Sequence, residues 1–229
     1  MALYLYATEF LRPLPDEAFH RLLGELPAAL QPKILRYRRW QDAHATLLGK
    51  HLLRLALKAA GSPATISQLL YTPQAKPYFP DGPHFNISHS GNRVVCGLST
   101  TGRIGVDIEI VKTLDFDDFQ TQFTPGEWTA IRGAADPVAA FYRFWTAKES
   151  LIKADGRGLE IPLLDLDVTE YQPVAIDGSS WAFRPLTHLP GYAGHLTTEA
   201  GDVGPVSSGE PIPGIEFREI SPTDIAAEL

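Results

Sequence analysis

The chain has 229 residues, enough for one large domain or two small ones, and 44% of them are hydrophobic, so a packed core is expected. The net charge of −7 argues against a nucleic-acid partner, which needs a basic surface, and the single cysteine, Cys96, excludes an internal disulfide and a multi-cysteine zinc site. No stretch approaches the roughly 18 apolar residues of a membrane span and no signal-peptide pattern is present, so we expect a cytoplasmic protein that acts without a membrane.

Hydrophobic periodicity and turn residues predict the elements of the first half of the chain. Leucines recur at helical spacing in the longest segment, which Gly61, Ser62 and Pro63 end. Prolines concentrated over residues 71–83 indicate an extended loop without regular structure. We expect helices over residues 16–26 and 41–60 and strands over residues 2–9, 85–88, 94–99 and 104–111.

The second half is expected to contain the clearest helix of the chain, over residues 138–154, with Gly156 and Gly158 just beyond its end. A segment rich in Gly, Ser and Pro, residues 201–214, predicts a mobile surface loop. The other expected elements are short helices over residues 116–123 and 127–132 and strands over residues 164–168, 181–185 and 191–198.

The order of these elements favours an α+β fold made of two similar α/β subdomains. Each half contains helices and antiparallel strands, and we place the boundary near residue 103. The expected N-terminal subdomain is residues 1–103, and the expected C-terminal subdomain is residues 104–229. Mostly antiparallel sheets with helices packed on them follow from this pattern.

Two carboxylates lie two residues apart in the predicted strand over residues 104–111. Because side chains alternate along a strand, Asp107 and Glu109 project from one face, while Val106, Ile108 and Ile110 fill the other. Close carboxylates repel each other, and a cation between them would remove that cost. This segment alone leaves two interpretations open: a cation site, or an exposed strand face wetted by two acids.

The predicted helix over residues 138–154 carries a second charged pair. Glu149 and Lys153 are one turn apart on one face, and Trp145 lies one turn earlier on that face. An exposed ion pair at this spacing is common and contributes only about 0.3–0.5 kcal/mol. The rest of this helix is aromatic and apolar, which indicates that its charges face something specific.

Groups that can bind an anion lie in the first half of the chain. Ser88, His89 and Ser90 place hydroxyls and an imidazole at a strand end, where they suit phosphate oxygens; a polar turn, or a Ser–His nucleophilic pair, is an alternative. Lys76 is held by Pro77 in a stiff loop and loses less freedom when it binds an anion. Further basic residues near the N-terminus are Lys33, Arg36, Arg38, Arg39, Lys50 and Arg54.

Five stretches, taken in order, resemble the surfactin-synthetase-activating type of 4′-phosphopantetheinyl transferase. They are Asp42-Ala43-His44-Ala45-Thr46-Leu47-Leu48-Gly49, Lys76-Pro77, Phe85-Asn86-Ile87-Ser88-His89-Ser90, Gly105-Val106-Asp107-Ile108-Glu109 and Trp145-Thr146-Ala147-Lys148-Glu149-Ser150-Leu151-Ile152-Lys153. Five such stretches in order are hard to obtain by accident. The C-terminal part of the chain resembles the family only in its pattern of strands.

The resemblance implies that the chain transfers the 4′-phosphopantetheine arm of coenzyme A to a serine of an acyl or peptidyl carrier protein, releasing adenosine 3′,5′-bisphosphate. It also implies a monomer with the active site between the two subdomains, and Mg²⁺, or Mn²⁺ in its place, as cofactor. Leu30 stands where the family has an upstream lysine. The residues at matching positions are Asp107, Glu109 and Glu149 for the metal, Lys153 for the phosphates, Lys76, Ser88 and His89 for the nucleotide end, and Lys33, Thr46 and Pro77 as further coenzyme contacts.

Within this interpretation, Glu149 is the expected base for the serine proton, directly or through a water, and Lys153 stabilises or protonates the leaving phosphate. Two other functions stay open. A metal-dependent nuclease would also combine acids with a lysine, but the acidic net charge counts against it. A coenzyme A or nucleotide-binding module without catalysis would have little need of a base such as Glu149.

An apolar stripe follows the acidic strand. Its members are Leu114, Phe116, Phe119 and Phe123, which recur at helical spacing. We favour a place in the core for this stripe, and the alternative is a docking surface for a helix of the carrier protein.

Overall fold

The computed structural model describes residues 2–169, 172–176, 178–199 and 215–229. The chain divides into two compact units, one formed by Met1–Thr101 with Ile215–Leu229 and the other by Gly102–Gly214. This division differs from the expected one at the C-terminus, because the last residues return to the first unit. That the halves act as similar subdomains with an active site at their junction stays a prediction.

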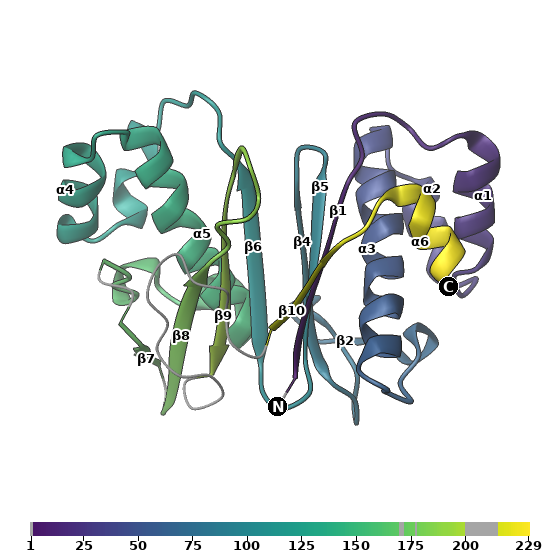
Figure 1. The fold of residues 1–229 in the computed structure, drawn as a ribbon. Helices are drawn as coiled ribbons and strands as arrows, with labels where there is room; N and C mark the ends of the chain where they lie inside the picture. Colours follow the sequence, from purple (N-terminus) through teal and green to yellow (C-terminus); the bar gives the residue numbers. More distant parts are fainter. Residues whose placement is uncertain (1, 170–171, 177, 200–214) are drawn as a thin grey trace. The chain divides into compact units, whose positions relative to one another are not determined.

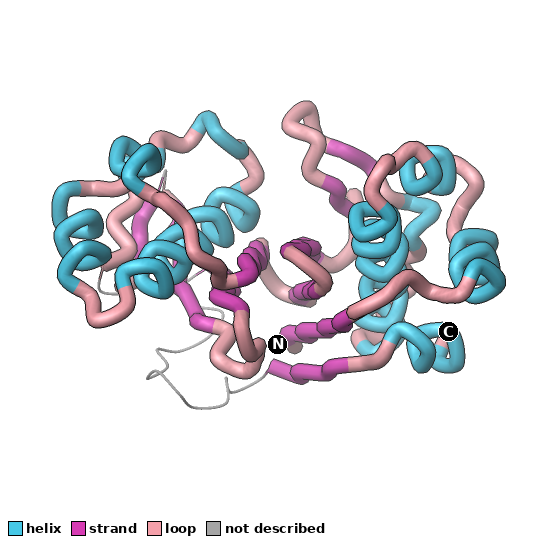
Figure 2. The backbone as a smooth tube through the Cα atoms, turned by 90° about the horizontal axis from the view of Figure 1, so that it is seen from above, coloured by secondary structure: helices cyan, strands magenta, loops and turns pink. Residues whose placement is uncertain are grey.

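The sheet of the first unit has the strand order β10-β1-β5-β4. Its strands are β1 (Leu3–Glu9), β4 (His84–Ser90), β5 (Arg93–Ser99) and β10 (Ile215–Glu219). Strand β10 runs parallel to β1, beside which it lies in Figures 1 and 2, while β5 is antiparallel to both β1 and β4. The pairing of β1 with β10 therefore joins the two ends of the chain in one sheet.

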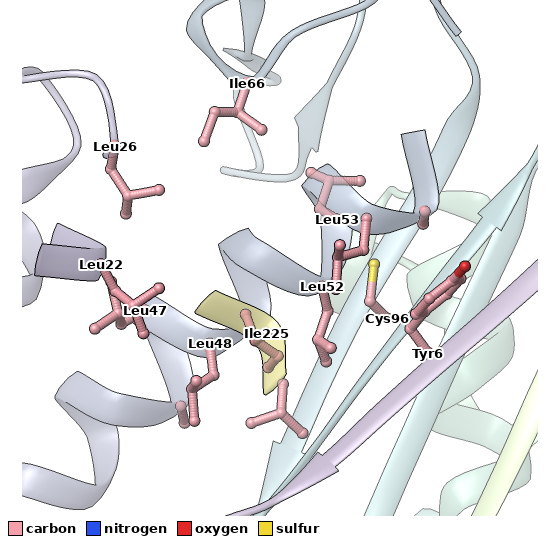
Figure 3. Packing of buried hydrophobic residues seen from close by; sticks show 14 of the residues in the cluster. Tyr6, Leu22, Leu26, Leu47, Leu48, Leu52, Leu53, Ile66, Cys96 and Ile225 are labelled. Atoms are coloured by element: carbon pink, nitrogen blue, oxygen red, sulfur yellow. The ribbon is translucent and has the colours of Figure 1, made fainter. Parts of the chain in front are cut away.

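Helix α3 (Trp40–Ala59) forms the centre of this unit's core. Its leucines are buried at helical spacing, and Leu48 and Leu52 have no exposed surface. Figure 3 shows them packed near Ile225 of helix α6 (Pro222–Glu228) and Cys96 of β5. Helices α1 (Asp16–Gly24) and α2 (Gln31–Leu35) add Leu22 and other apolar residues to the same cluster.

The second unit has an antiparallel sheet with the order β6-β9-β8-β7. Its strands are β6 (Ile104–Ile110), β7 (Val174–Ile176), β8 (Ser179–Pro185) and β9 (Tyr192–Glu199). The alternation expected of β6 is confirmed on its apolar side, since Val106 and Ile108 have no exposed surface and Ile110 is half-buried.

Two helices of this unit begin at side-chain caps. Thr124 forms a capping box with Glu127 at the start of α4 (Pro125–Gly133), and the side chain of Asp136 accepts a hydrogen bond from the Ala139 amide at the start of α5 (Pro137–Asp155). Gly156 ends α5 in the left-handed conformation, with φ of 96°. Short 3₁₀ turns lie at η2 (Asp117–Gln122), η3 (Gly158–Glu160) and η4 (Leu163–Asp165).

The predicted α+β fold with mainly antiparallel sheets and packed helices is confirmed. The strand predicted over residues 164–168 is wrong, because the segment begins in η4 and the amide of Val168 donates a hydrogen bond to Oε1 of Glu127 instead of to a neighbouring strand. Its apolar alternation reflects Leu166 and Val168, which are buried without a strand ladder.

The proline-rich segment also differs from its prediction, because a short hairpin forms within it. Strands β2 (Leu70–Tyr71) and β3 (Pro77–Tyr78) pair through a turn in which Ala75 has a φ of 62°. A further 3₁₀ turn, η1 (Ile66–Gln68), precedes the hairpin. Helices α2 and α6 and strands β7 and β10 were also not predicted. The loop predicted over residues 201–214 lies outside the described residues.

No helix within the described part of the chain is both long enough and apolar enough to cross a membrane.

Candidate active site

Helix α5 approaches strand β6 at Gly105, where the strand has no side chain. A Cβ at this position would lie 2.0 Å from the carbonyl oxygen of Ser150 and 2.3 Å from the amide nitrogen of Ala154. Both distances are far below van der Waals contact, so only glycine allows the backbones of α5 and β6 to come this close. This approach determines which α5 side chains can reach the strand.

Asp107 and Glu109 lie on the same face of β6 as Gly105, because strand side chains alternate. Asp107 is only 3% exposed beneath α5. The ammonium nitrogen of Lys153 donates to Oδ1 of Asp107 at 2.5 Å. Lys153 therefore pairs with an acid on the strand, so it is more than one half of a surface pair with Glu149 on its own helix.

Glu149 lies among the same charges. Burial raises the pKa of its carboxyl group, the negative charges of Asp107 and Glu109 raise it further, and Lys153 lowers it. The predicted residues Asp107, Glu109, Glu149 and Lys153 thus form one electrostatic cluster, which we call the acid cluster. Asp107 is therefore not a wetted surface residue, whereas Glu109 is half-exposed, and the choice between a cation site and an acidic strand face is not decided by burial.

The acid cluster is not assembled as a ready metal site. Among the residues that the structure describes, no group of three or more His, Cys, Asp or Glu side chains is placed to hold a metal ion. In the conformation described, the positive charge next to Asp107 is that of Lys153. The metal ligands stay a prediction.

Two polar contacts connect α5 to strand β9. Thr146 Oγ1 lies 2.8 Å from Nδ1 of His195, and one helical turn later Ser150 Oγ lies 2.7 Å from Thr197 Oγ1. Burial lowers the pKa of His195 to about 3, so its ring is neutral near pH 7. These contacts fix the rotation of α5 about its axis and thereby the direction in which Glu149 points.

The first unit contains a separate cavity of about 180 Å³. Four of the residues predicted to contact the coenzyme line it, namely Lys33 of α2, Thr46 of α3, Pro77 of β3 and His89 of β4. Two further contacts predicted in the first unit are not among its lining residues: Lys76 is half-buried in the β2–β3 turn, and Ser88 is buried on β4. The remaining predicted contacts, Asp107, Glu149 and Lys153, belong to the acid cluster of the second unit. The structure thus gathers part of the predicted anion site.

Comparison with known proteins identifies the family. A model of the 4′-phosphopantetheinyl transferase superfamily matches residues 103–192, which include the whole acid cluster. The 4′-phosphopantetheinyl transferase Sfp of Bacillus subtilis (strain 168) is 32% identical over 194 residues, which are 82% of this chain and 84% of that protein. The chain belongs to the 4′-phosphopantetheinyl transferase superfamily.

Further relatives agree with this assignment and confirm the resemblance drawn from the five motifs. A 4′-phosphopantetheinyl transferase of Bacillus subtilis is 38% identical over 165 residues, 69% of this chain and 73% of that protein. The 4′-phosphopantetheinyl transferase ffp, also of Bacillus subtilis, is 33% identical over 192 residues, 81% of this chain and 83% of that protein.

The transferase also contains a buried ion pair that motif reasoning missed. Lys148 and Glu127 have no exposed side-chain surface, and Nζ lies 2.7 Å from Oε2. Lys148 also donates to the carbonyls of Leu163 and Gln122, and Glu127 accepts from the amides of Thr124 and Val168. The pair connects α5 with the segments around α4. The capping-box pattern of Thr124 and Glu127 is the one feature of the sequence that points to a structural role for Glu127.

The apolar stripe of the transferase belongs to the core, as we favoured. Phe116 and Phe123 are 7% and 3% exposed, while Leu114 and Phe119 pack against the same cluster. The rings of Phe116, Phe119 and Phe123 all contact Phe141 of α5, with centroids 5.2–5.6 Å apart. Trp145, expected beside Glu149, also stacks in this cluster.

We predict that Gly105→Ala strongly destabilises the second unit. The new Cβ would collide with backbone atoms of α5, which cannot rotate away as a side chain can, and such overpacking typically costs about 1–3 kcal/mol or more. Urea denaturation should show the loss. Gly133→Ala is the matched control, because a Cβ there meets nothing within 4 Å. Equal stability of the two variants would contradict this account of the helix–strand contact.

We also predict strong coupling between Lys148 and Glu127. Lys148→Met alone should cost about 3–5 kcal/mol, because it leaves the Glu127 carboxylate buried without its cation. The double variant Lys148→Met/Glu127→Gln should lose clearly less than the sum of the two single variants. A double-mutant cycle of unfolding free energies measures this difference, and simple additivity would show that the two charges do not stabilise each other.

Proposed function

We propose that the chain transfers the 4′-phosphopantetheine arm of coenzyme A to a serine of an apo acyl or peptidyl carrier protein. The observation that carries this proposal is the acid cluster, in which Lys153 meets Asp107 beside Glu149 within the segment matched by the superfamily. The relatives named above are 4′-phosphopantetheinyl transferases, and similarity over more than four fifths of Sfp supports the same reaction here.

The chemistry of the acid cluster fits a divalent metal. Asp107, Glu109 and Glu149 supply carboxylate oxygens, the donors that Mg²⁺ and Mn²⁺ prefer. Burial raises the pKa of Glu149 and the charges of Asp107 and Glu109 raise it further, and a bound cation would remove this repulsion. When bound there, Mg²⁺ would neutralise negative charge on the pyrophosphate. Mn²⁺ is the alternative ion with the same ligand preference.

The remaining chemistry is assigned to side chains of the chain itself. Glu149 accepts the proton of the serine hydroxyl, directly or through a water, as the serine oxygen bonds to the phosphorus that carries the pantetheine arm. The bond from this phosphorus to the bridging oxygen breaks, and adenosine 3′,5′-bisphosphate leaves. Lys153, one turn further along α5, stabilises or protonates the departing phosphate.

The nucleotide end of the coenzyme is assigned to the cavity of the first unit. Lys33, Thr46, Pro77 and His89 line it, and Lys76 and Ser88 are proposed as further contacts from the neighbouring hairpin and strand. We further propose that the protein acts in the cytoplasm as a monomer, on a carrier protein and without nucleic acid.

Two rival functions make different demands on these residues. A nuclease needs a broad basic surface, which the net charge of −7 disfavours. A coenzyme-binding module needs no base, so it does not explain why Glu149 is held among other carboxylates. The transferase accounts for both the acid cluster and the cationic cavity.

The direct test is incubation with coenzyme A, Mg²⁺ and apo carrier proteins from fatty-acid, polyketide and peptide synthesis. Intact mass spectrometry should show the addition of one phosphopantetheine arm to at least one carrier. EDTA should abolish the mass gain, and excess Mg²⁺ should restore it, because the carboxylates and the pyrophosphate are all negatively charged and need a cation between them. A protein that modifies none of these carriers, with folded structure verified by circular dichroism, would refute the proposed reaction.

Glu149→Gln tests the assignment of the base. The amide has the shape of the carboxylate but cannot accept the serine proton, so we expect turnover to fall by about 10²–10⁴-fold under saturating Mg²⁺. Coenzyme A binding, measured by calorimetry without a carrier, should be retained. Glu17→Gln is the control, because Glu17 is exposed in the first turn of α1. Full turnover by Glu149→Gln would remove Glu149 from the role of base.

A further inference from the structure

The cavity of the first unit has a wall residue that no sequence motif indicated. Lys50 lies on α3 one turn after Thr46, and both residues line the cavity together with Lys33. Lys50 is half-buried. In the sequence it was only one of six basic residues between positions 33 and 54, and solvent exposure alone would explain such a group.

Close packing of α3 on the sheet places Lys50 at this wall. A Cβ at Gly49 would lie 2.9 Å from Cγ2 of Ile87 on β4, so glycine lets the helix lie directly on the strand. Leu48 and Leu52, two residues to either side of Lys50, point into the core cluster, where Figure 3 shows them, and Lys50 points away from both because it lies about 200° from each around the helix axis. Lys50 therefore faces the β4 side of the helix, where Ile87 and His89 line the same cavity.

The cavity carries positive charge without compensation. Among the described residues that line it, none is acidic, and no carboxylate in the described chain forms an ion pair with Lys50. Burial lowers the pKa of Lys50 to about 8, and the like charge of Lys33 contributes to this lowering. Two lysines held near each other in this way are stabilised by an anion that neutralises both.

The volume of the cavity and the residues that line it indicate which kind of molecule carries this anion. A volume of about 180 Å³ is below the usual size of a site for a complete ligand, so the cavity takes one end of a larger molecule. Tyr37 and Tyr71 line it and are 38% and 45% exposed, so their rings are available to stack on a base or to pack on a sugar. Cations beside exposed aromatic rings suit a nucleotide.

We propose that Lys50 is a specificity residue of this cavity: with Lys33 it binds the phosphate monoester of coenzyme A, and it thereby distinguishes coenzyme A from 3′-dephospho-coenzyme A. The choice of phosphate follows from charge. The 3′-phosphate is the only monoester of coenzyme A and carries close to two negative charges at neutral pH, whereas each pyrophosphate group carries one. A dianion matches two ammonium groups. The inference rests on the proposed function, in which this cavity takes the nucleotide end.

Lys50→Met tests the inference by calorimetry with coenzyme A and with 3′-dephospho-coenzyme A, without carrier or Mg²⁺. The wild type should prefer coenzyme A, and the variant should bind it about tenfold more weakly while binding of the dephospho form is unchanged, because one charge-assisted hydrogen bond is lost. Lys58→Met is the matched control, since Lys58 lies on the same helix but its ammonium donates to the carbonyl of Glu228, away from this cavity.

Lys50→Arg should keep the preference for coenzyme A within a few-fold, and it is the second variant, which keeps the test open if Lys50→Met fails to fold. Equal weakening of both ligands in Lys50→Met, or no weakening of either, would overturn the inference, as would loss of the preference in Lys58→Met. Failure of the proposed function looks different: Lys50-dependent binding of coenzyme A would persist, while no carrier protein gained mass.

Discussion

The close approach of α5 to β6 at Gly105 is the constraint on which the candidate site depends. Because no side chain separates the two backbones there, the next residue on that face, Asp107, lies beneath the helix and is nearly excluded from water. In this geometry Lys153 reaches Asp107 at 2.5 Å. The same proximity buries Glu149 and places it near two other carboxylates, and both effects raise its pKa. A methyl side chain at position 105 would push α5 away from β6 and weaken all of these interactions together.

Three successive residues of α5 have different roles: two stabilise the fold, and one is a candidate for catalysis. Each residue of a helix is turned by about 100° from the one before, so Lys148, Glu149 and Ser150 point in three directions. Lys148 enters the buried pair with Glu127, and Ser150 bonds to Thr197 of β9. Glu149, between them, is held toward the acid cluster. The charged residues of this motif are therefore not interchangeable: one is a structural cation in the core, and one is a candidate base.

Sequence periodicity predicted the parts of this structure that depend on local order. The α5 helix, the β6 alternation and the proximity of Asp107, Glu149 and Lys153 follow from spacing and motif. The β1–β10 pairing could not be predicted in this way, because it joins segments separated by almost the whole chain. The buried Lys148–Glu127 pair was hidden for a related reason, since a lysine next to a glutamate in a helix looks like surface charge until tertiary contacts are known. Leu166 and Val168 alternate as in a strand but have no strand partner.

The net negative charge of the chain conceals two local fields of opposite sign. The acid cluster concentrates three carboxylates around one lysine, so it is stabilised by an added cation. The cavity of the first unit concentrates Lys33 and Lys50 without an acidic lining residue, so it is stabilised by an added anion. The ligand that we propose, coenzyme A with a divalent metal, would supply a cation to the first site and an anion to the second. The charges of the two sites thus support the proposed function by an argument from electrostatics, in addition to the argument from the family motifs.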